Sequence, residues 1–184
     1  TFFLAAQGFM LAQVEQTNKN VGRLDAFLLD EPDVSYDSLR QSDLFTEVGR
    51  VYVTASVEGA GGYLGYYDNT ALDHMYRTVI DGRMPECTGE IAIEQSTLLA
   101  MNIDHNWSVG DTITLSLIPI DGQAEERSFT LVGILRDQAA KLDFTKDFHT
   151  SEEYVKQFPV MLTSQDEPGF NSGRTVVHHT FLVD

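Results

Sequence analysis

A cluster of glycines is the first feature of this sequence that could support chemistry, because glycine-rich loops can hold phosphate groups. The cluster consists of Gly59, Gly61, Gly62 and Gly65. It lacks the Gly-Lys-Ser/Thr ending of a nucleotide-binding loop, and Leu64 stands where a dinucleotide-binding fingerprint requires glycine. The stretch from Glu58 to Gly65 is therefore expected to form a flexible loop or hairpin tip, and no cofactor is predicted.

Five histidines raise the question of a metal site: His74, His105, His149, His178 and His179. None of them belongs to an HExxH motif or to the paired spacing of a zinc site. His178 and His179 are adjacent in a predicted strand, where neighbouring side chains point to opposite faces. They cannot easily share one metal ion, so no metal ligand is predicted.

Candidate nucleophiles are equally sparse, because the sequence contains no GxSxG nucleophile elbow. Cys87 follows Pro85 in a predicted turn, and the carboxylates of Glu86 and Glu90 nearby disfavour its thiolate form. Adjacent acidic residues could serve a glycosidase, but in so acidic a chain such pairs are typical of a solvated surface. We therefore predict no catalytic residue, and an acidic hydrolase is only the third of three functional hypotheses.

Three tyrosines beside the glycine cluster are the best local candidates for contact with a partner: Tyr63, Tyr66 and Tyr67. Tyrosine offers a large contact area at a low cost in conformational entropy. The same residues could instead pack in the core or within a hairpin, and the sequence leaves both interpretations open.

The charge balance restricts the possible partners. The chain has 28 acidic and 12 basic residues, which gives a formal net charge of -16. Binding to a nucleic acid depends on Lys and Arg side chains that neutralise phosphates, so a nucleic acid partner is excluded. A negative field of this size favours solubility and attracts cationic partners such as basic peptides.

Length and periodicity predict an α+β fold in one domain, residues 1–184, because this length can bury a substantial core. The single Cys87 cannot form an internal disulfide. Alternating apolar residues predict strands, and helical spacing with capping residues predicts short helices. The predicted strands are Arg23–Leu29, Phe45–Val57, a segment at Ile91 and Ile93, Thr112–Ile120, Ser128–Leu135, Pro159–Thr163 and Thr175–Val183.

The predicted helices are short except for the first, which runs from Phe2 to about Asn20. A helix from Ser35 to about Asp43 would be capped by Ser35, a second by Asn69 or Thr70, and a third by Ser96 or Thr97. A fourth is expected near Ser151–Gln157.

The N-terminal residues TFFLAA are apolar and resemble the last turn of a longer segment, although the chain has no run of about 18 apolar residues that could span a bilayer. We expect this segment to begin close to a membrane helix. The alternative is an amphipathic N-terminal helix of a soluble protein.

The stretch from Ile80 to Asp137 has the most specific order of motifs in the chain. It contains Gly82-Arg83-x-Pro85, a strand headed by Gly89-Glu90, a short helix, a strand opened by Gly110-Asp111 and a closing strand with Gly133. This order resembles the extracytoplasmic domain of MacB/FtsX-type ABC transporter permeases.

The resemblance implies a mixed, mainly antiparallel sheet with short helices, like the MacB periplasmic core, with an inserted β-rich lobe at about residues 81–137. It also implies that seven residues have structural roles at turns, strand entries or crowded strand positions. These residues are Gly82, Arg83, Pro85, Glu90, Gly110, Asp111 and Gly133.

The functional hypothesis that follows is a non-catalytic domain on the extracellular or periplasmic side of the cell membrane. The resemblance implies flanking transmembrane helices in the same chain and a cytoplasmic ATPase subunit as partners. The domain would couple ATP-driven motion to an external cationic peptide, lipoprotein or cell-wall factor. A different hypothesis is a free-standing secreted or surface module that binds cationic peptides.

Overall fold

The computed structural model describes residues 22–23, 25–28, 35–101, 106–120, 122–139, 158–167 and 176–183. The helices there are α2 (Tyr36–Arg40), α3 (Asn69–Met75) and α4 (Gln95–Met101). The strands are β1 (Ala26–Leu28), β2 (Glu47–Val57), β3 (Gly62–Tyr67), β4 (Val79–Gly82), β5 (Glu90–Glu94), β6 (Thr112–Pro119), β7 (Glu125–Leu135), β8 (Met161–Thr163) and β9 (Val176–Leu182).

The fold class predicted from the sequence is confirmed, because the described strands form one mixed sheet accompanied by short helices. Two of the strand pairings are parallel, β3 with β8 and β5 with β7. The others are antiparallel, so the sheet is mainly antiparallel.

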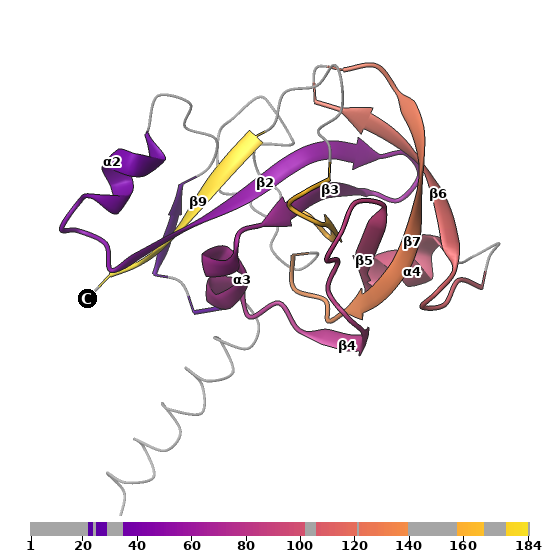
Figure 1. The fold of residues 1–184 in the computed structure, drawn as a ribbon, viewed down its shortest axis with the longest axis horizontal. Coiled ribbons are helices and arrows are strands. Elements are labelled where there is room, and N and C mark those ends of the chain that lie inside the picture. Colours follow the sequence, from indigo (N-terminus) through magenta and orange to yellow (C-terminus); the bar gives the residue numbers. More distant parts are fainter. Residues whose placement is uncertain are drawn as a thin grey trace, which may run out of the picture.

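Six of the strands close into a ring. The sheet runs from β2 through β3, β8 and β5 to β7, and β6 pairs with both β7 and β2. The contact that closes the ring joins Ala55, Ser56 and Val57 of β2 to Pro119, Ile118 and Leu117 of β6. Strands β9 and β1 extend the sheet beyond β2, and β4 extends it beyond β7 (Figure 1).

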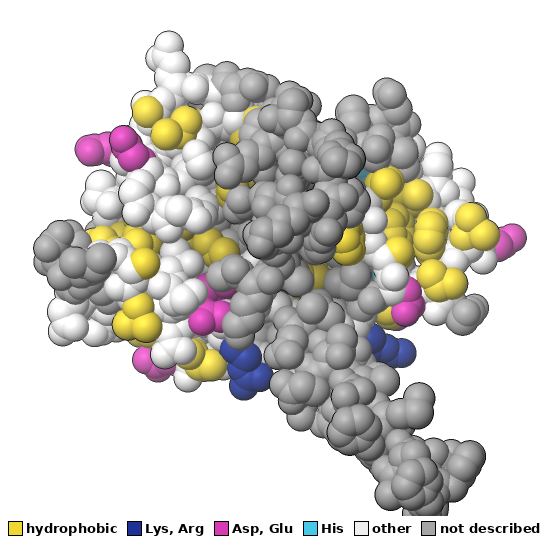
Figure 2. Space-filling model, turned by 180° about the vertical axis from the view of Figure 1, so that it is seen from behind, with side chains coloured by type: hydrophobic (Ala, Val, Ile, Leu, Met, Phe, Trp, Pro, Cys, Tyr) yellow, Lys and Arg dark blue, Asp and Glu magenta, His cyan; other side chains and the backbone are white. Residues whose placement is uncertain are grey.

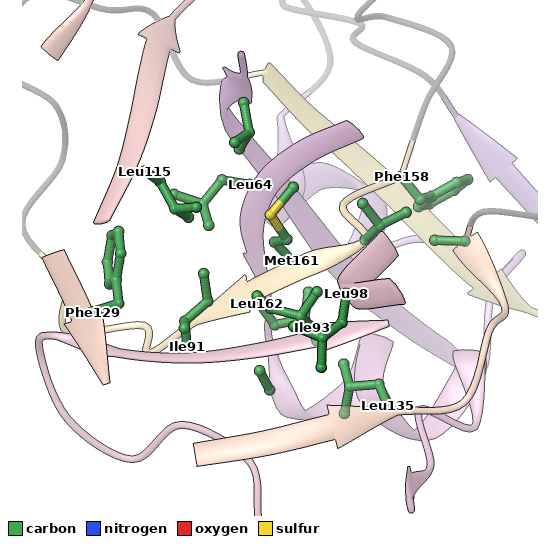
Figure 3. Close-up of a cluster of buried hydrophobic side chains, with 14 of the residues drawn as sticks. Leu64, Ile91, Ile93, Leu98, Leu115, Phe129, Leu135, Phe158, Met161 and Leu162 are labelled. Carbon is green, nitrogen blue, oxygen red and sulfur yellow. The ribbon is translucent and has the colours of Figure 1, made fainter. Parts of the chain in front are cut away.

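The ring is small, so its interior must be filled by side chains. Ile113, Leu117, Leu131 and Met161 come from three of its strands and have no exposed surface. Figure 3 shows the side chains of Leu162, Ile93 and Leu98 lying next to one another, which joins β8, β5 and α4 in one cluster. Apolar burial in this cluster is the main source of stability for the sheet.

Strands with clear alternation occur where the sequence predicts them. In β6, Ile113, Leu115 and Leu117 are buried whereas Thr112 and Thr114 are exposed. In β2, Val51, Val53, Ala55 and Val57 are all buried, as predicted. Strands β1, β5, β8 and β9 also lie within or close to their predicted ranges. The predicted strand Ser128–Leu135 is confirmed but begins three residues earlier, at Glu125.

Three local predictions are wrong. The glycine-rich stretch does form a hairpin tip between β2 and β3, but its predicted end at Gly65 is wrong, because Gly62 already begins β3. Helix α3 is capped by Asp68, whose carboxylate accepts the N–H of Ala71 at 2.9 Å, and not by Asn69 or Thr70. Helix α4 begins at Gln95, ahead of the predicted caps.

Other differences concern helix ends and the segments without a described structure. Ser35 is the N-cap residue of α2, but its side chain makes no capping hydrogen bond and the helix ends at Arg40. Near the start of a different helix, α4, the carboxylate of Asp137 accepts the N–H of Ser96 at 2.8 Å. The predicted helices Phe2–Asn20 and Ser151–Gln157 lie outside the described residues.

A buried ion pair joins the end of α3 to β5. The guanidinium of Arg77 contacts the carboxylate of Glu94, and the side chains are 1% and 0% exposed. The same carboxylate accepts the N–H groups of Gln138 and Ala139, at 3.1 and 2.7 Å. The Nε and Nη2 atoms of Arg77 have no hydrogen-bond partner. The pair therefore fixes three chain segments, although its guanidinium is incompletely satisfied.

Replacing Arg77 with methionine should destabilise the protein by about 3–5 kcal/mol, because it leaves the carboxylate of Glu94 buried without its cation. Adding Glu94→Gln removes that charge but keeps an oxygen that can accept the two N–H groups. The double variant should therefore be more stable than Arg77→Met alone. Urea denaturation of the three proteins measures this, and a double variant less stable than Arg77→Met would contradict it.

Candidate functional site

One edge of strand β7 pairs with two different strands in succession. Its first half, Glu125–Thr130, pairs with β6, and its end, from Gly133, pairs with β4. Between them, the backbone of Leu131 and Val132 needs partners from elsewhere, since buried backbone groups are almost always hydrogen-bonded. We call this place the β7 junction, formed by Gly82, Arg83, Gly110, Asp111 and residues 131–133.

Residues just before β6 and just after β4 provide hydrogen-bond partners for the backbone groups of Leu131 and Val132. The N–H of Gly110 donates to the carbonyl of Leu131 at 2.8 Å, and the N–H of Leu131 donates to the carbonyl of Asp111 at 2.8 Å. From the other side, the N–H of Arg83 donates to the carbonyl of Val132 at 2.8 Å. The Asp111 carboxylate also accepts the N–H of Ser108 at 2.8 Å, which shapes the turn before β6.

Two glycines allow the chains to approach this closely. Gly82 pairs with Gly133 across β4 and β7. A Cβ atom on Gly133 would lie 2.1 Å from the carbonyl oxygen of Arg83, and one on Gly82 would lie 2.1 Å from that of Val132. Gly82 also has φ of +73°, a conformation that glycine adopts readily. Neither position has room for a side chain.

Arg83 and Glu90 clamp the turn between β4 and β5. The guanidinium contacts both carboxylate oxygens of Glu90, one of them at 2.8 Å. Glu90 also accepts the N–H of Glu86 at 2.9 Å and that of Cys87 at 3.3 Å. The Arg83 hydrogen bond, followed by the Glu86 N–H, lowers the pKa of Glu90 to about 2 from an ordinary value of 4.5. The turn is thus held by an ionised carboxylate.

The clamp forms one wall of a groove of about 340 Å³. Met84, Pro85 and Glu86 line this wall, and the end of β8 with the following turn, residues 162–166, lines the wall opposite. Tyr67, Asn69 and Leu72, from the end of β3 and from α3, complete it. The groove therefore joins three segments that are far apart in the sequence.

Hydrogen bonds hold the two walls in place. The Thr88 hydroxyl donates to the carbonyl of Asp166 at 3.0 Å, and the N–H of Gly89 donates to the carboxylate of Glu167 at 2.7 Å. Glu167 in turn accepts from Arg127 at 3.0 Å. The side-chain amide of Gln165 donates to the carbonyl of Tyr67 at 3.0 Å. We name this site the acidic groove, because Glu86 and Asp166 are the charged residues that line it.

The structure separates the three candidate tyrosines. Tyr67 is 2% exposed, and its hydroxyl donates to the carbonyl of Pro159 at 3.3 Å. Tyr66 stacks on Tyr52 with ring centroids 4.3 Å apart, and Tyr63 packs against a separate cluster of Val53, Ile120 and Val176. Tyr67 alone reaches the acidic groove. Adjacent strand residues face opposite sides, which separates Tyr66 from Tyr67.

The described histidines take part in packing. His74 is hydrogen-bonded to Thr180 at 2.8 Å. His178 and His179 contact Phe158 and Tyr36 respectively, on opposite faces of β9. His105 and His149 lie outside the described residues. Within the described ranges, no three His, Cys, Asp or Glu side chains are grouped as a metal ion would require.

Cys87 is exposed on the turn beside Glu90. Desolvation, the hydrogen bond to Glu90 and the charge of Glu90 raise the pKa of its thiol. This direction agrees with the sequence-based expectation that the neighbouring carboxylates disfavour the thiolate.

The sequence signalled one wall of the acidic groove through the Gly82-Arg83-x-Pro85 motif, but not the other. Leu72, Leu162 and Asp166 carry no motif, and only the three-dimensional pairing of β3, β8 and β5 brings them to the turn.

On the face seen in Figure 2, acidic side chains are spread widely, and the visible Lys and Arg side chains lie in its lower part. None of the helices in the described part of the chain is long and apolar enough to cross a membrane.

Comparison with known proteins gives fold relatives only. No family model matches the chain, and no curated protein matches it. Several solved structures resemble it, two of which are described here. One is a domain assigned to a permease protein from Porphyromonas gingivalis, at 13% identity and a TM-score of 0.38. The other is the periplasmic region of MacB from Actinobacillus actinomycetemcomitans, at 12% identity and a TM-score of 0.45.

The alignments cover 89% and 87% of this chain. They cover 64% of the permease domain, less than two thirds of its length, and 67% of the MacB region. Both descriptions name the class of protein that the sequence resembles. The identities and TM-scores are low, so the two likenesses assign neither an activity nor a partner to this chain.

Replacing Gly133 with valine should destabilise the protein by about 1–3 kcal/mol, as overpacking of a filled site does. The added side chain meets the backbone carbonyl of Arg83, which can move only if the β4–β7 pairing shifts. The matched control is Thr130→Ala at an exposed position of the same strand, which should change stability by less than about 0.5 kcal/mol. Equal urea midpoints for the two variants would disprove the close-approach argument.

The low pKa of Glu90 also predicts that the stability of the protein depends on pH. The pKa of Glu90 is lower in the folded protein than in the unfolded chain, so its contribution is complete above pH 4.5 and is lost as pH falls towards 2. Glu90→Gln should lower stability at pH 6 and flatten the decline below pH 4.5. The control is Glu126→Gln, an exposed carboxylate outside the clamp, which should change neither the stability at pH 6 nor the slope. Urea midpoints between pH 6 and 2.5 measure both effects, and an unchanged slope in Glu90→Gln would rule out the clamp as a source of acid sensitivity.

Proposed function

We propose that this chain is the extracytoplasmic domain of an ABC transporter permease of the MacB/FtsX type. The observation that supports this is where the family-like residues lie. Four of them, Gly82, Arg83, Gly110 and Asp111, meet Gly133 at the β7 junction, although they are up to 51 positions apart in the sequence. Glu90 and Pro85 lie in the adjoining clamped turn. The motif order thus corresponds to one structural unit, as a shared fold requires.

We propose a single domain that includes residues 81–137 rather than a separate lobe. Strands β5, β6 and β7 of that range complete a ring with β2, β3 and β8, which lie outside it. Such a ring has one common interior, and a closed, filled barrel moves as one body. A rigid body of this kind suits a domain that transmits motion from membrane helices of its own chain.

The proposed role is non-catalytic. In the described part of the chain, the one cysteine has a thiol with a raised pKa and sits beside a carboxylate that is already occupied by Arg83. In this proposal, a cytoplasmic ATPase subunit supplies the energy, and the domain contacts an external partner. No cofactor is part of the proposal.

Cys87 provides a direct test of location, because it is the only cysteine of the chain and is exposed. In intact cells that make the full-length protein, a membrane-impermeant maleimide should label Cys87 at mildly alkaline pH. The Cys87→Ser variant is the control for cysteines elsewhere in the protein. Labelling that requires lysis of the cells would place the domain in the cytoplasm and refute the proposal.

The same label tests coupling. With a donor dye on Cys87 and an acceptor dye on lipids of a nanodisc, energy transfer should change when ATP is added to the permease with its ATPase. An ATPase variant unable to bind ATP should abolish the change. A signal indifferent to ATP would favour a passive surface module that binds a partner.

A further inference from the structure

The acidic groove has the dimensions and the rigidity of a binding site. Its volume of about 340 Å³ is at the low end of the range for ligand pockets. Its walls are held before any ligand arrives, by the Thr88–Asp166 and Gly89–Glu167 hydrogen bonds and by the clamp on Glu90. A preformed site spends little free energy on ordering when a ligand binds.

The lining specifies the chemistry of the occupant. Leu72, Met84 and Leu162 supply aliphatic and thioether surface, and Glu86 and Asp166, from two different segments, supply its carboxylates. No Lys or Arg of the described chain lines the groove. Arg83, the nearest in sequence, pairs with both oxygens of Glu90 and lies 4.0 Å from the carboxylate of Glu86, which stays 75% exposed. The groove therefore disfavours anions and suits a cation carried on an apolar stem.

We propose that the acidic groove binds a basic side chain, arginine or lysine, of an extracytoplasmic polypeptide. The stem would lie on Leu72 and Met84, and the charged end would reach Glu86 or Asp166. The exposed Asn69 at the rim carries an amide that can bond to the backbone of the same peptide. Charge complementarity supports a peptide partner, because the chain has a net charge of -16.

This inference rests on the proposed function for the location of the groove outside the cell, but its chemistry can be tested on the chain alone. The probe is the capped tripeptide Ac-Leu-Arg-Leu-NH2, titrated into ¹⁵N-labelled protein at low ionic strength. The matched control peptide carries citrulline, a neutral isostere of arginine. We expect the arginine peptide to shift amide resonances of Leu72, Met84 and Gln165, and the citrulline peptide to bind more weakly.

Two pairs of substitutions separate the groove from the overall charge. Glu86→Gln with Asp166→Asn should weaken binding roughly fivefold, the effect of losing two partly exposed ion pairs. Asp43→Asn with Glu126→Gln removes the same two negative charges from exposed sites elsewhere and should leave the affinity nearly unchanged. Thermal melting of each variant checks that the fold is kept.

Three outcomes would overturn the inference: equal binding of the citrulline peptide, resonance shifts spread over the acidic surface, or equal loss of affinity in both double variants. Failure of the proposed function looks different. If Cys87 is labelled only after lysis but the arginine peptide still binds the groove, the permease location is wrong and the groove is a binding site in another setting. If labelling succeeds and the peptide does not bind, only the groove inference fails.

Discussion

The β7 junction is the constraint on which the rest of the structure depends. An 11-residue strand passes one edge from β6 to β4, and the backbone groups at the change must be satisfied without a continuous partner strand. Gly110, Asp111 and Arg83 provide the missing hydrogen bonds. The backbone at Arg83 and that of β7 come this close because positions 82 and 133 lack a Cβ atom. At Gly82, Gly110, Asp111 and Gly133, four of the residues that resemble the permease family, the contacts at the junction are made by backbone groups.

The junction also connects the ring to the groove. Strand β6 starts at the junction and pairs along β7 as far as Leu117, where its other end also pairs with β2 and closes the ring, while β4 takes the place of β6 on β7 beyond the junction. The turn after β4 then starts from a fixed position, and the Arg83–Glu90 clamp sets its course past the end of β8. The same strand β7 therefore takes part in the ring and, through β4, fixes the start of the turn that lines the groove.

The sequence predicted what depends on local pattern. Alternation located most strands, including β2 and β6, because one face of each is buried in the ring. It missed β4, whose residues are mostly exposed and which exists only through its pairing with β7. Capping of α4 by Asp137 and the groove wall at Asp166 depend on contacts 41 and 78 positions away, which no local pattern encodes. The three tyrosines are close in sequence but not in space, because neighbouring side chains of β3 point to opposite faces and Tyr67 points into the core.

The way in which arginines are used explains why the groove stays negative. Seven arginines and no lysine fall within the described residues, and four of the arginines, at positions 50, 77, 83 and 127, pair with carboxylates that fix turns or helix ends. The pairs at Arg77 and Arg83 neutralise Glu94 and Glu90, which are buried or nearly so, and leave Glu86 and Asp166 open to solvent. More than half of the described arginines are thus engaged in ion pairs that hold turns and helix ends. Because no Lys or Arg of the described residues lines the groove, its two exposed carboxylates give it a negative character.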